Sequence, residues 1–115
     1  MNIAGIGVDI VEVSRFRTVF KKKQTRFIDN TFSVGEQKYC YAYRDPAPHF
    51  AGMFAAKEAV RKATGDFSHA LSVVEVRHTK TGKPEMWIKG KRSRSILVSI
   101  THTRSAACAV VINQK

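Results

Sequence analysis

Residues 49–65 read HFAGMFAAKEAVRKATG and give the clearest secondary-structure signal in the chain. The alanine-rich stretch predicts a helix over His49–Thr64, and Gly65 is a typical residue to end it. Lys57 and Arg61 fall on the side of this helix that carries the bulky apolar residues. Each must therefore extend to solvent, form an ion pair or reach an anion.

Glu58 and Lys62 lie about 40° apart around the same helix, on a flank lined by Ala51 and Ala55. One interpretation is an i,i+4 ion pair on a solvated face, which contributes about 0.2–0.5 kcal/mol. The other is a flank where a ligand or a second backbone comes close. The spacing favours the first interpretation. The alanine lining favours the second, because solvated faces are usually built from longer polar side chains.

The N-terminal run IAGIGVDI, residues 3–10, predicts a mostly buried strand. Gly5 and Gly7 weaken a strand, so their presence indicates close approach by a neighbouring backbone or a ligand. Asp9 closes the run and is either a cap or turn residue or part of a binding site. An acid in this position is notable because the chain has 9 acidic residues against 20 basic ones.

The remaining patterns predict an α+β fold. A helix starts near Val13 and ends at Lys21–Lys23, and a capping box at Ser33–Glu36 starts another that runs to about Tyr43. Two hairpins follow, with strands at 73–79 and 85–89 and at 96–101 and 106–112. Helices therefore gather in the first half and strands in the second.

Length and composition predict one domain over residues 1–115, small for an enclosed cleft, so that a site shared between subunits deserves consideration. No apolar run reaches the roughly 20 residues that span a bilayer, and Asp9 and Glu12 interrupt any N-terminal signal. We therefore expect a cytoplasmic protein with Cys40 and Cys108 reduced. The net charge of +11 predicts a polyanionic partner: nucleic acid, a phosphorylated metabolite, an acidic protein or an anionic membrane.

Taken together, these segments resemble the holo-acyl-carrier-protein synthase family, the small bacterial-type 4′-phosphopantetheinyl transferases. The likeness covers nearly the whole chain in five ordered motifs. They are Gly5-Ile6-Gly7-Val8-Asp9-Ile10 followed by Glu12 and Arg15; Phe32-Ser33-x-x-Glu36-x-x-Tyr39-Cys40; residues 54–63; Gly82-Lys83-Pro84; and Ser99-Ile100-Thr101-His102. The chain departs from the family pattern at Arg61, in the turn at 64–67 and in the basic stretch 89–94.

The resemblance implies a phosphopantetheinyl transferase fold, in which a long helix packs on an antiparallel β-sheet, and a homotrimer with active sites between subunits. It implies a Mg²⁺-dependent enzyme that moves 4′-phosphopantetheine from coenzyme A to a serine of apo acyl carrier protein and releases adenosine 3′,5′-bisphosphate. No nucleic-acid or membrane partner is expected.

The resemblance also assigns the site. Asp9 and Glu58 are the metal ligands, and Asp9, Glu58 and Lys62 are the catalytic residues; either Glu58 or a metal-bound water takes the serine proton. Coenzyme A is assigned to Lys57, Lys62, Gly82, Lys83, Pro84 and His102. Arg15 and Phe16 are assigned to docking of the carrier protein. Two open alternatives are a plain hairpin-turn role for His102 and a core position for Phe16.

Two other functions compete with this one. A nucleic-acid-binding module could use the basic runs Lys21–Lys23 and 89–94 together with the aromatic residues Tyr39, Tyr41, Tyr43 and Trp87. No recognition-helix, zinc or RNA-recognition signature accompanies them. A carrier-protein-binding module without catalysis is the third possibility. The presence of Asp9, Glu58 and Lys62 argues against it.

Overall fold

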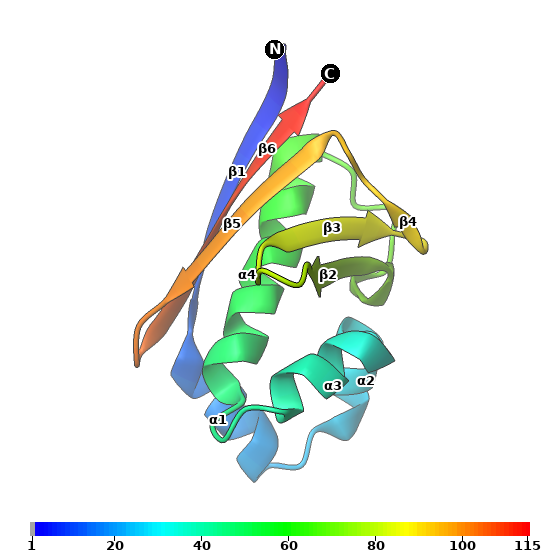
Figure 1. The fold of residues 1–115 in the computed structure, drawn as a ribbon. Coiled ribbons are helices and arrows are strands. Elements are labelled where there is room, and N and C mark those ends of the chain that lie inside the picture. Colours follow the sequence, from blue (N-terminus) through cyan, green and yellow to red (C-terminus); the bar gives the residue numbers. More distant parts are fainter. Residues whose placement is uncertain (1) are drawn as a thin grey trace.

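The computed structural model describes residues 2–115 as two three-stranded antiparallel sheets around one long helix (Figure 1). The elements in chain order are β1 (Ile3–Glu12), α1 (Val13–Lys21), α2 (Thr25–Thr31), α3 (Val34–Tyr41), α4 (Ala47–Thr64), the 3₁₀ turn η1 (Leu71–Val73), β2 (Val74–His78), β3 (Pro84–Ile88), β4 (Lys91–Arg92), β5 (Ile96–His102) and β6 (Ala106–Gln114). Within residues 2–115, no helix is long and apolar enough to cross a membrane. The predicted α+β class and the helix-on-sheet packing are confirmed.

The central helix α4 begins two residues before the predicted start. Pro46 is its N-cap residue and Pro48 lies in the first turn, where a missing N–H costs no helical hydrogen bond. Gly65 ends the helix with φ +70°, a left-handed conformation that favours glycine. The proline-containing segment 46–48 thus starts the helix.

The first sheet has the order β1-β6-β5 and lies along the whole length of α4 (Figure 1). Gly5 and Gly7 face the helix backbone directly. A Cβ atom at Gly5 would collide with the main-chain oxygen of Ala63, and one at Gly7 with that of Ala59. The close approach predicted from these glycines is therefore confirmed, and the neighbour is α4.

The outer face of β1 differs from the sequence prediction. Ile6 and Ile10 are 68% and 70% exposed, and Val8 is also exposed, so in the single chain the strand is not mostly buried. Cys108, which pairs with Ile10 across the β1–β6 ladder, lies on the same face and is partly exposed rather than in the core. This face is an apolar surface without a covering element in the described chain.

The second sheet, β2-β3-β4, lies beside the other flank of α4 and begins after η1. The hairpin predicted around residues 81–84 joins β2 to β3, and the one around 102–105 joins β5 to β6. Both hairpin predictions are confirmed.

Helices α1, α2 and α3 close the lower end of the molecule in Figure 1 around a cluster of phenylalanines. Phe16 is fully buried, and its ring lies within 5.8–6.1 Å of the rings of four others, Phe27, Phe32, Phe50 and Phe54. The predicted helix α1 and the capping box of α3 are confirmed, although α3 ends at Tyr41. Helix α2 was not predicted.

Replacing Gly7 by alanine tests the contact between β1 and α4. The new methyl group meets a helix carbonyl that cannot rotate away, so we expect the free energy of unfolding to fall by about 3 kcal/mol or more. Gly35→Ala is the matched control, because a Cβ there has only the Ser33 Oγ at 3.9 Å. Chemical denaturation of both variants measures the difference, and equal stability would contradict the packing argument.

Candidate functional site

Asp9 and Glu58, which lie 49 residues apart in sequence, line one open pocket of about 530 Å³. Asp9 reaches it from β1 and Glu58 from α4, because the two backbones are in contact. Glu12, Arg15 and Phe54 complete the polar and aromatic part of the lining. The convergence of the two carboxylates is therefore a consequence of the glycine contacts described above.

Asp9 and Glu58 each have a cation beside them. The Lys62 ammonium donates to Asp9 Oδ1 at 3.0 Å and to the carbonyl oxygen of Val8 at 3.0 Å. Arg61 Nη1 lies 3.8 Å from Glu58 Oε1. Glu58 and Lys62 therefore do not form the i,i+4 ion pair, because the Lys62 side chain reaches across to β1 instead. This favours the interpretation of that flank as a close-contact site.

Arg15 extends from α1 toward the same pocket. Its guanidinium carbon lies 4.6 Å from the ring centre of Phe54 and 6.0 Å from that of Phe27, so two aromatic faces support it. Phe16 points the other way, into the phenylalanine cluster, and is 0% exposed. The assignment of Phe16 to carrier docking is therefore wrong, and the alternative of a core position is correct.

Lys57 does not belong to the site either. Its ammonium is fully buried and donates to Glu36 Oε1 at 2.7 Å and to the carbonyl oxygens of Leu71 and Val74 at 2.8 and 2.6 Å. These three bonds use every donor of the group, which leaves none for coenzyme A. The assignment of Lys57 to coenzyme A is wrong. The sequence left three possibilities for this side chain, namely extension to solvent, an ion pair or contact with an anion, and the ion pair is the one that forms.

The Lys57–Glu36 pair joins α4 to α3 and β2. Glu36 also accepts from the backbone N–H of Ser33 and of Val76, at 2.9 and 2.8 Å. Burial raises the pKa of Glu36 and lowers the pKa of Lys57, and the charge of each partner opposes the shift of the other. Removing one member would strand a buried charge, at a cost of about 3–5 kcal/mol.

A second pocket, of about 260 Å³, lies where α4 meets β2, β3 and β5. Gly82, Pro84 and His102 line it, as three of the residues assigned to coenzyme A. Lys83 does not line this pocket but a neighbouring one with Arg92 and Arg94. The pocket also contains residues that the site prediction missed: Tyr39, Tyr43, His49 and His78.

The two pockets share no lining residue. The described chain therefore brings Asp9, Glu58, Lys62 and Arg15 together, and separately brings Gly82, Pro84 and His102 together, but does not join the two groups. Among residues 2–115, no three His, Cys, Asp or Glu side chains are placed to hold one metal ion. Asp9 and Glu58 remain as a pair of carboxylates at one pocket.

Comparison with known proteins agrees with this geometry. A model of the 4′-phosphopantetheinyl transferase superfamily matches residues 5–111. The chain belongs to this superfamily. Two similar proteins, each named holo-[acyl-carrier-protein] synthase, come from Thermodesulfovibrio yellowstonii (39% identical, 96% of this chain and 97% of the relative) and Protochlamydia amoebophila (40%, 94% and 95%).

Solved structures of superfamily members have the same fold. A holo-(acyl-carrier-protein) synthase from Bacillus anthracis, in complex with CoA (3′,5′-ADP), has a TM-score of 0.84 at 29% identity and covers 100% of this chain and 99% of its own. The holo-[acyl-carrier-protein] synthase from Neisseria meningitidis has a TM-score of 0.83 at 27% identity, covering 98% and 99%. The family predicted from the five motifs is confirmed.

Proposed function

We propose that this chain transfers 4′-phosphopantetheine from coenzyme A to a serine hydroxyl of apo acyl carrier protein. The serine oxygen forms a bond to the β-phosphorus of coenzyme A, the bond from that phosphorus to the bridging pyrophosphate oxygen breaks, and adenosine 3′,5′-bisphosphate leaves. The observation that carries the proposal is the convergence of Asp9 and Glu58 at one pocket, with Lys62 bonded to Asp9, in a chain of this superfamily.

The residues of this pocket fit a Mg²⁺ ion. Mg²⁺ binds oxygen ligands, keeps several waters and is commonly held by one or two carboxylates together with substrate phosphates. Asp9 and Glu58 supply two carboxylates on an open pocket, and Lys62 binds one oxygen of the Asp9 carboxylate, Oδ1. When bound, Mg²⁺ would neutralise charge on the pyrophosphate.

The chain's own groups supply the rest of the catalysis. Lys62, held by Asp9 and the Val8 carbonyl, presents a positive charge beside Asp9, where it can stabilise charge on the pyrophosphate as its bond breaks. Glu58 is the carboxylate placed to accept the serine proton. Gly82, Lys83, Pro84 and His102 are assigned to the nucleotide end of coenzyme A. We further propose a cytoplasmic location, consistent with the two free thiols Cys40 and Cys108.

Mass spectrometry of the carrier protein tests the function. With coenzyme A and Mg²⁺, the wild-type enzyme should raise the mass of apo carrier protein by one phosphopantetheine. Asp9→Ala and Glu58→Ala should each reduce the rate by a factor of about 10³ or more, because charge stabilisation is the main catalytic term in phosphoryl transfer. Lys38→Ala, an exposed residue of α3, is the control. An unchanged carrier mass with the wild-type enzyme would leave nucleic-acid binding as the favoured function.

We also propose that the active enzyme is a homotrimer with sites between subunits. The outward face of the β1-β6-β5 sheet carries the exposed apolar residues Ile6, Val8, Ile10, Leu97 and Val110. A contiguous apolar surface of this kind typically marks a protein interface. A cyclic arrangement would set the Asp9 pocket of one copy beside the His102 pocket of the next, and so supply the junction that one chain lacks.

Subunit complementation tests this arrangement. Asp9→Ala and His102→Ala variants should each be nearly inactive, but their co-assembled mixture should recover about a quarter of wild-type activity. In rings assembled at random from equal amounts of the two variants, this is the fraction of interfaces that combine an intact Asp9 pocket with an intact His102 pocket. Analytical ultracentrifugation of the same sample gives the oligomeric state. A monomer, or a mixture with no more activity than its components, would contradict the shared site.

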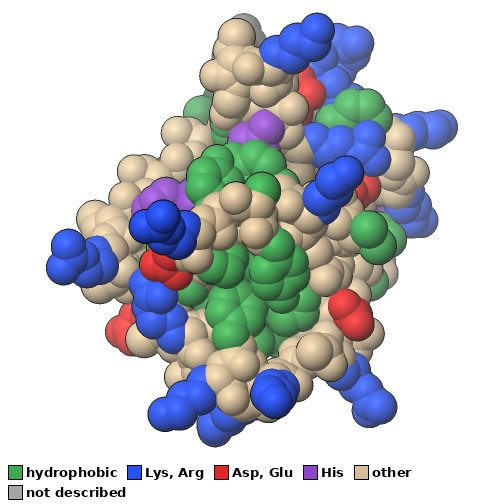
Figure 2. All heavy atoms as spheres, turned by 60° about the horizontal axis from the view of Figure 1, so that its bottom comes forward, with side chains coloured by type: hydrophobic (Ala, Val, Ile, Leu, Met, Phe, Trp, Pro, Cys, Tyr) green, Lys and Arg blue, Asp and Glu red, His purple; other side chains and the backbone are tan. Residues whose placement is uncertain are grey.

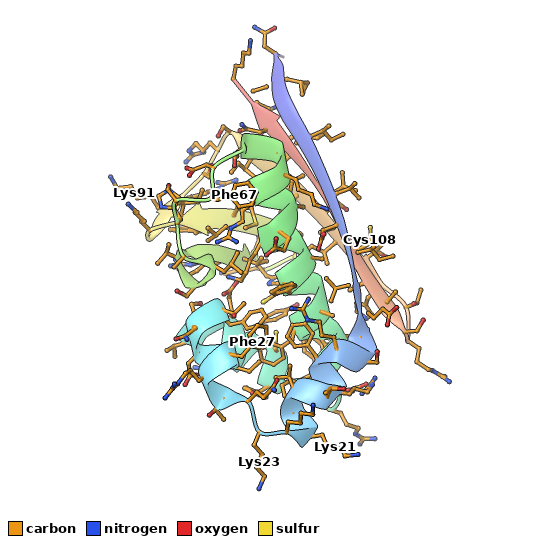
Figure 3. The ribbon with its side chains drawn as sticks, turned by 180° about the vertical axis from the view of Figure 1, so that it is seen from behind. Lys21, Lys23, Phe27, Phe67, Lys91 and Cys108 are labelled. Carbon is orange, nitrogen blue, oxygen red and sulfur yellow. The ribbon has the colours of Figure 1, made fainter. Side chains whose placement is uncertain are left out.

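Docking of the carrier protein is assigned to Arg15 and the basic surface around it. Figure 2 shows Lys and Arg side chains around an apolar area on the helical end of the molecule, and in Figure 3 Lys21 and Lys23 project away from the end of α1. Carrier proteins of this kind offer an acidic helix, and such a surface would attract it.

Reversing the charge at Arg15 tests the docking role. Arg15→Glu should raise KM for the carrier protein by about tenfold, since a contacting charge pair becomes a repulsion, while KM for coenzyme A changes much less. Arg26→Glu, on the neighbouring helix α2, is the control for net charge. Equal effects of Arg15→Glu on both substrates would place Arg15 outside the docking surface.

A further inference from the structure

Three of the chain's four histidines line one pocket. His49 comes from α4, His78 from the end of β2 and His102 from the end of β5, and only His69 lies elsewhere. No Asp, Glu, Lys or Arg side chain is among the lining residues of this pocket. Protonation of the imidazoles is therefore the only way in which the lining itself acquires positive charge.

The rings of the pocket are fixed by stacking. Tyr43 and His49 are parallel with ring centres 3.5 Å apart, and Tyr39 and His78 are parallel at 4.0 Å. The two tyrosine hydroxyls hydrogen-bond to each other at 3.0 Å, and the ring of His102 meets that of His49 edge-on at 5.2 Å. The imidazoles are held in place before any ligand arrives, which lowers the entropic cost of binding.

The charged groups near the pocket do not neutralise it. The acid that acts on His49 is Asp45, and Arg17 already engages both of its carboxylate oxygens at 2.9 Å. Burial of Tyr39, together with its bond to Tyr43, raises its pKa, so this phenol stays protonated at neutral pH. His49 and His78 are then the groups of this pocket that a bound anion can bring to protonation near neutral pH.

Burial lowers the pKa of His49, and the nearby His102 and His78 lower it further against the opposing effect of Asp45. Burial also lowers the pKa of His78. Both imidazoles are therefore mainly neutral at pH 7 in the free protein. An anion in the pocket would act in the opposite direction, because it stabilises the protonated form of each ring.

We propose that this three-histidine pocket binds the phosphate-bearing nucleotide end of coenzyme A together with a proton, with His49 and His78 as binding residues beside His102. The inference rests on the proposed function, which brings coenzyme A to Gly82, Pro84 and His102. Parallel aromatic pairs offer faces for a nucleobase, and ring N–H groups donate to phosphate oxygens.

Linkage fixes the direction of the pH effect. If nucleotide binding takes up a proton, affinity rises as pH falls from about 8 toward the pKa of the free imidazoles and levels off below it. If the pocket binds without taking up a proton, affinity stays level or falls as pH is lowered, because the phosphates of the ligand themselves take up protons at about pH 6. The two cases differ in slope, which makes the inference measurable without any variant.

Isothermal titration calorimetry with adenosine 3′,5′-bisphosphate is the test, at pH 6.8 in two buffers of different ionisation enthalpy. We expect the wild-type protein to take up about 0.5–1 proton per nucleotide bound, the range for one histidine crossing from neutral to charged. His49→Gln and His78→Gln should each reduce this uptake and weaken binding about tenfold at pH 6.8, the loss of one charge-assisted hydrogen bond. At pH 8 the variants and wild type should converge. His69→Gln, outside the pocket, should match wild type throughout.

Uptake of no proton by the wild-type protein, uptake unchanged in both variants, or no binding of the bisphosphate would each overturn the inference. These outcomes are separate from the fate of the proposed function. A carrier protein that gains phosphopantetheine while the bisphosphate binds without a proton would keep the transferase and reject the histidine linkage. Proton-linked binding with no transfer to the carrier would support the pocket and reject the transferase.

Discussion

The contact between the backbone of β1 and that of α4 is the constraint on which the rest of the structure depends. Gly5 and Gly7 let the strand come within main-chain distance of Ala59 and Ala63, closer than any side chain would allow. Because the separation is so small, the short carboxylate of Asp9 reaches the flank of the helix. A larger residue at Gly5 or Gly7 would move Asp9 away from Lys62 and Glu58.

A second anchor fixes how α4 is rotated. Lys57 points inward and its ammonium is saturated by Glu36 and two carbonyl oxygens, so the next residue, Glu58, must point about 100° away, toward β1. A buried ion pair contributes little net stability, because desolvation opposes the attraction. The ion pair instead determines orientation, because only one rotation of α4 about its axis lets Lys57 reach Glu36 and the two carbonyl oxygens. The close contact at Gly5 and Gly7 thus sets the distance between the two carboxylates. The Lys57–Glu36 ion pair sets their orientation.

The sequence predicted those parts of the fold whose cause is local. Gly65, the capping box at Ser33–Glu36 and the two hairpin turns determine their own conformations, and all are confirmed. Features that depend on distant partners were missed. Lys57 was taken for a ligand-binding residue because Glu36, its partner, is 21 residues earlier and had a sufficient role as a capping residue. Helix α2 was missed because residues 29–31, Asp-Asn-Thr, are weak helix formers that only packing of Ile28 holds in place.

The same reasoning explains why the described chain brings together only part of the predicted coenzyme A site. Asp9 lies on β1 and His102 on β5, and the strand order β1-β6-β5 puts them on opposite edges of one sheet. Two strand spacings, roughly 10 Å, separate the edges, and the Asp9 pocket and the His102 pocket share no lining residue in the described chain. A heterologous interface joins unlike surfaces of successive copies. The apolar outer face of this sheet supplies such a surface, and burying it would bring one edge of each copy to the other edge of its neighbour. In the proposed homotrimer, the exposure of β1 and the separation of the two pockets would have one common cause: each chain would carry two half-sites that another copy completes.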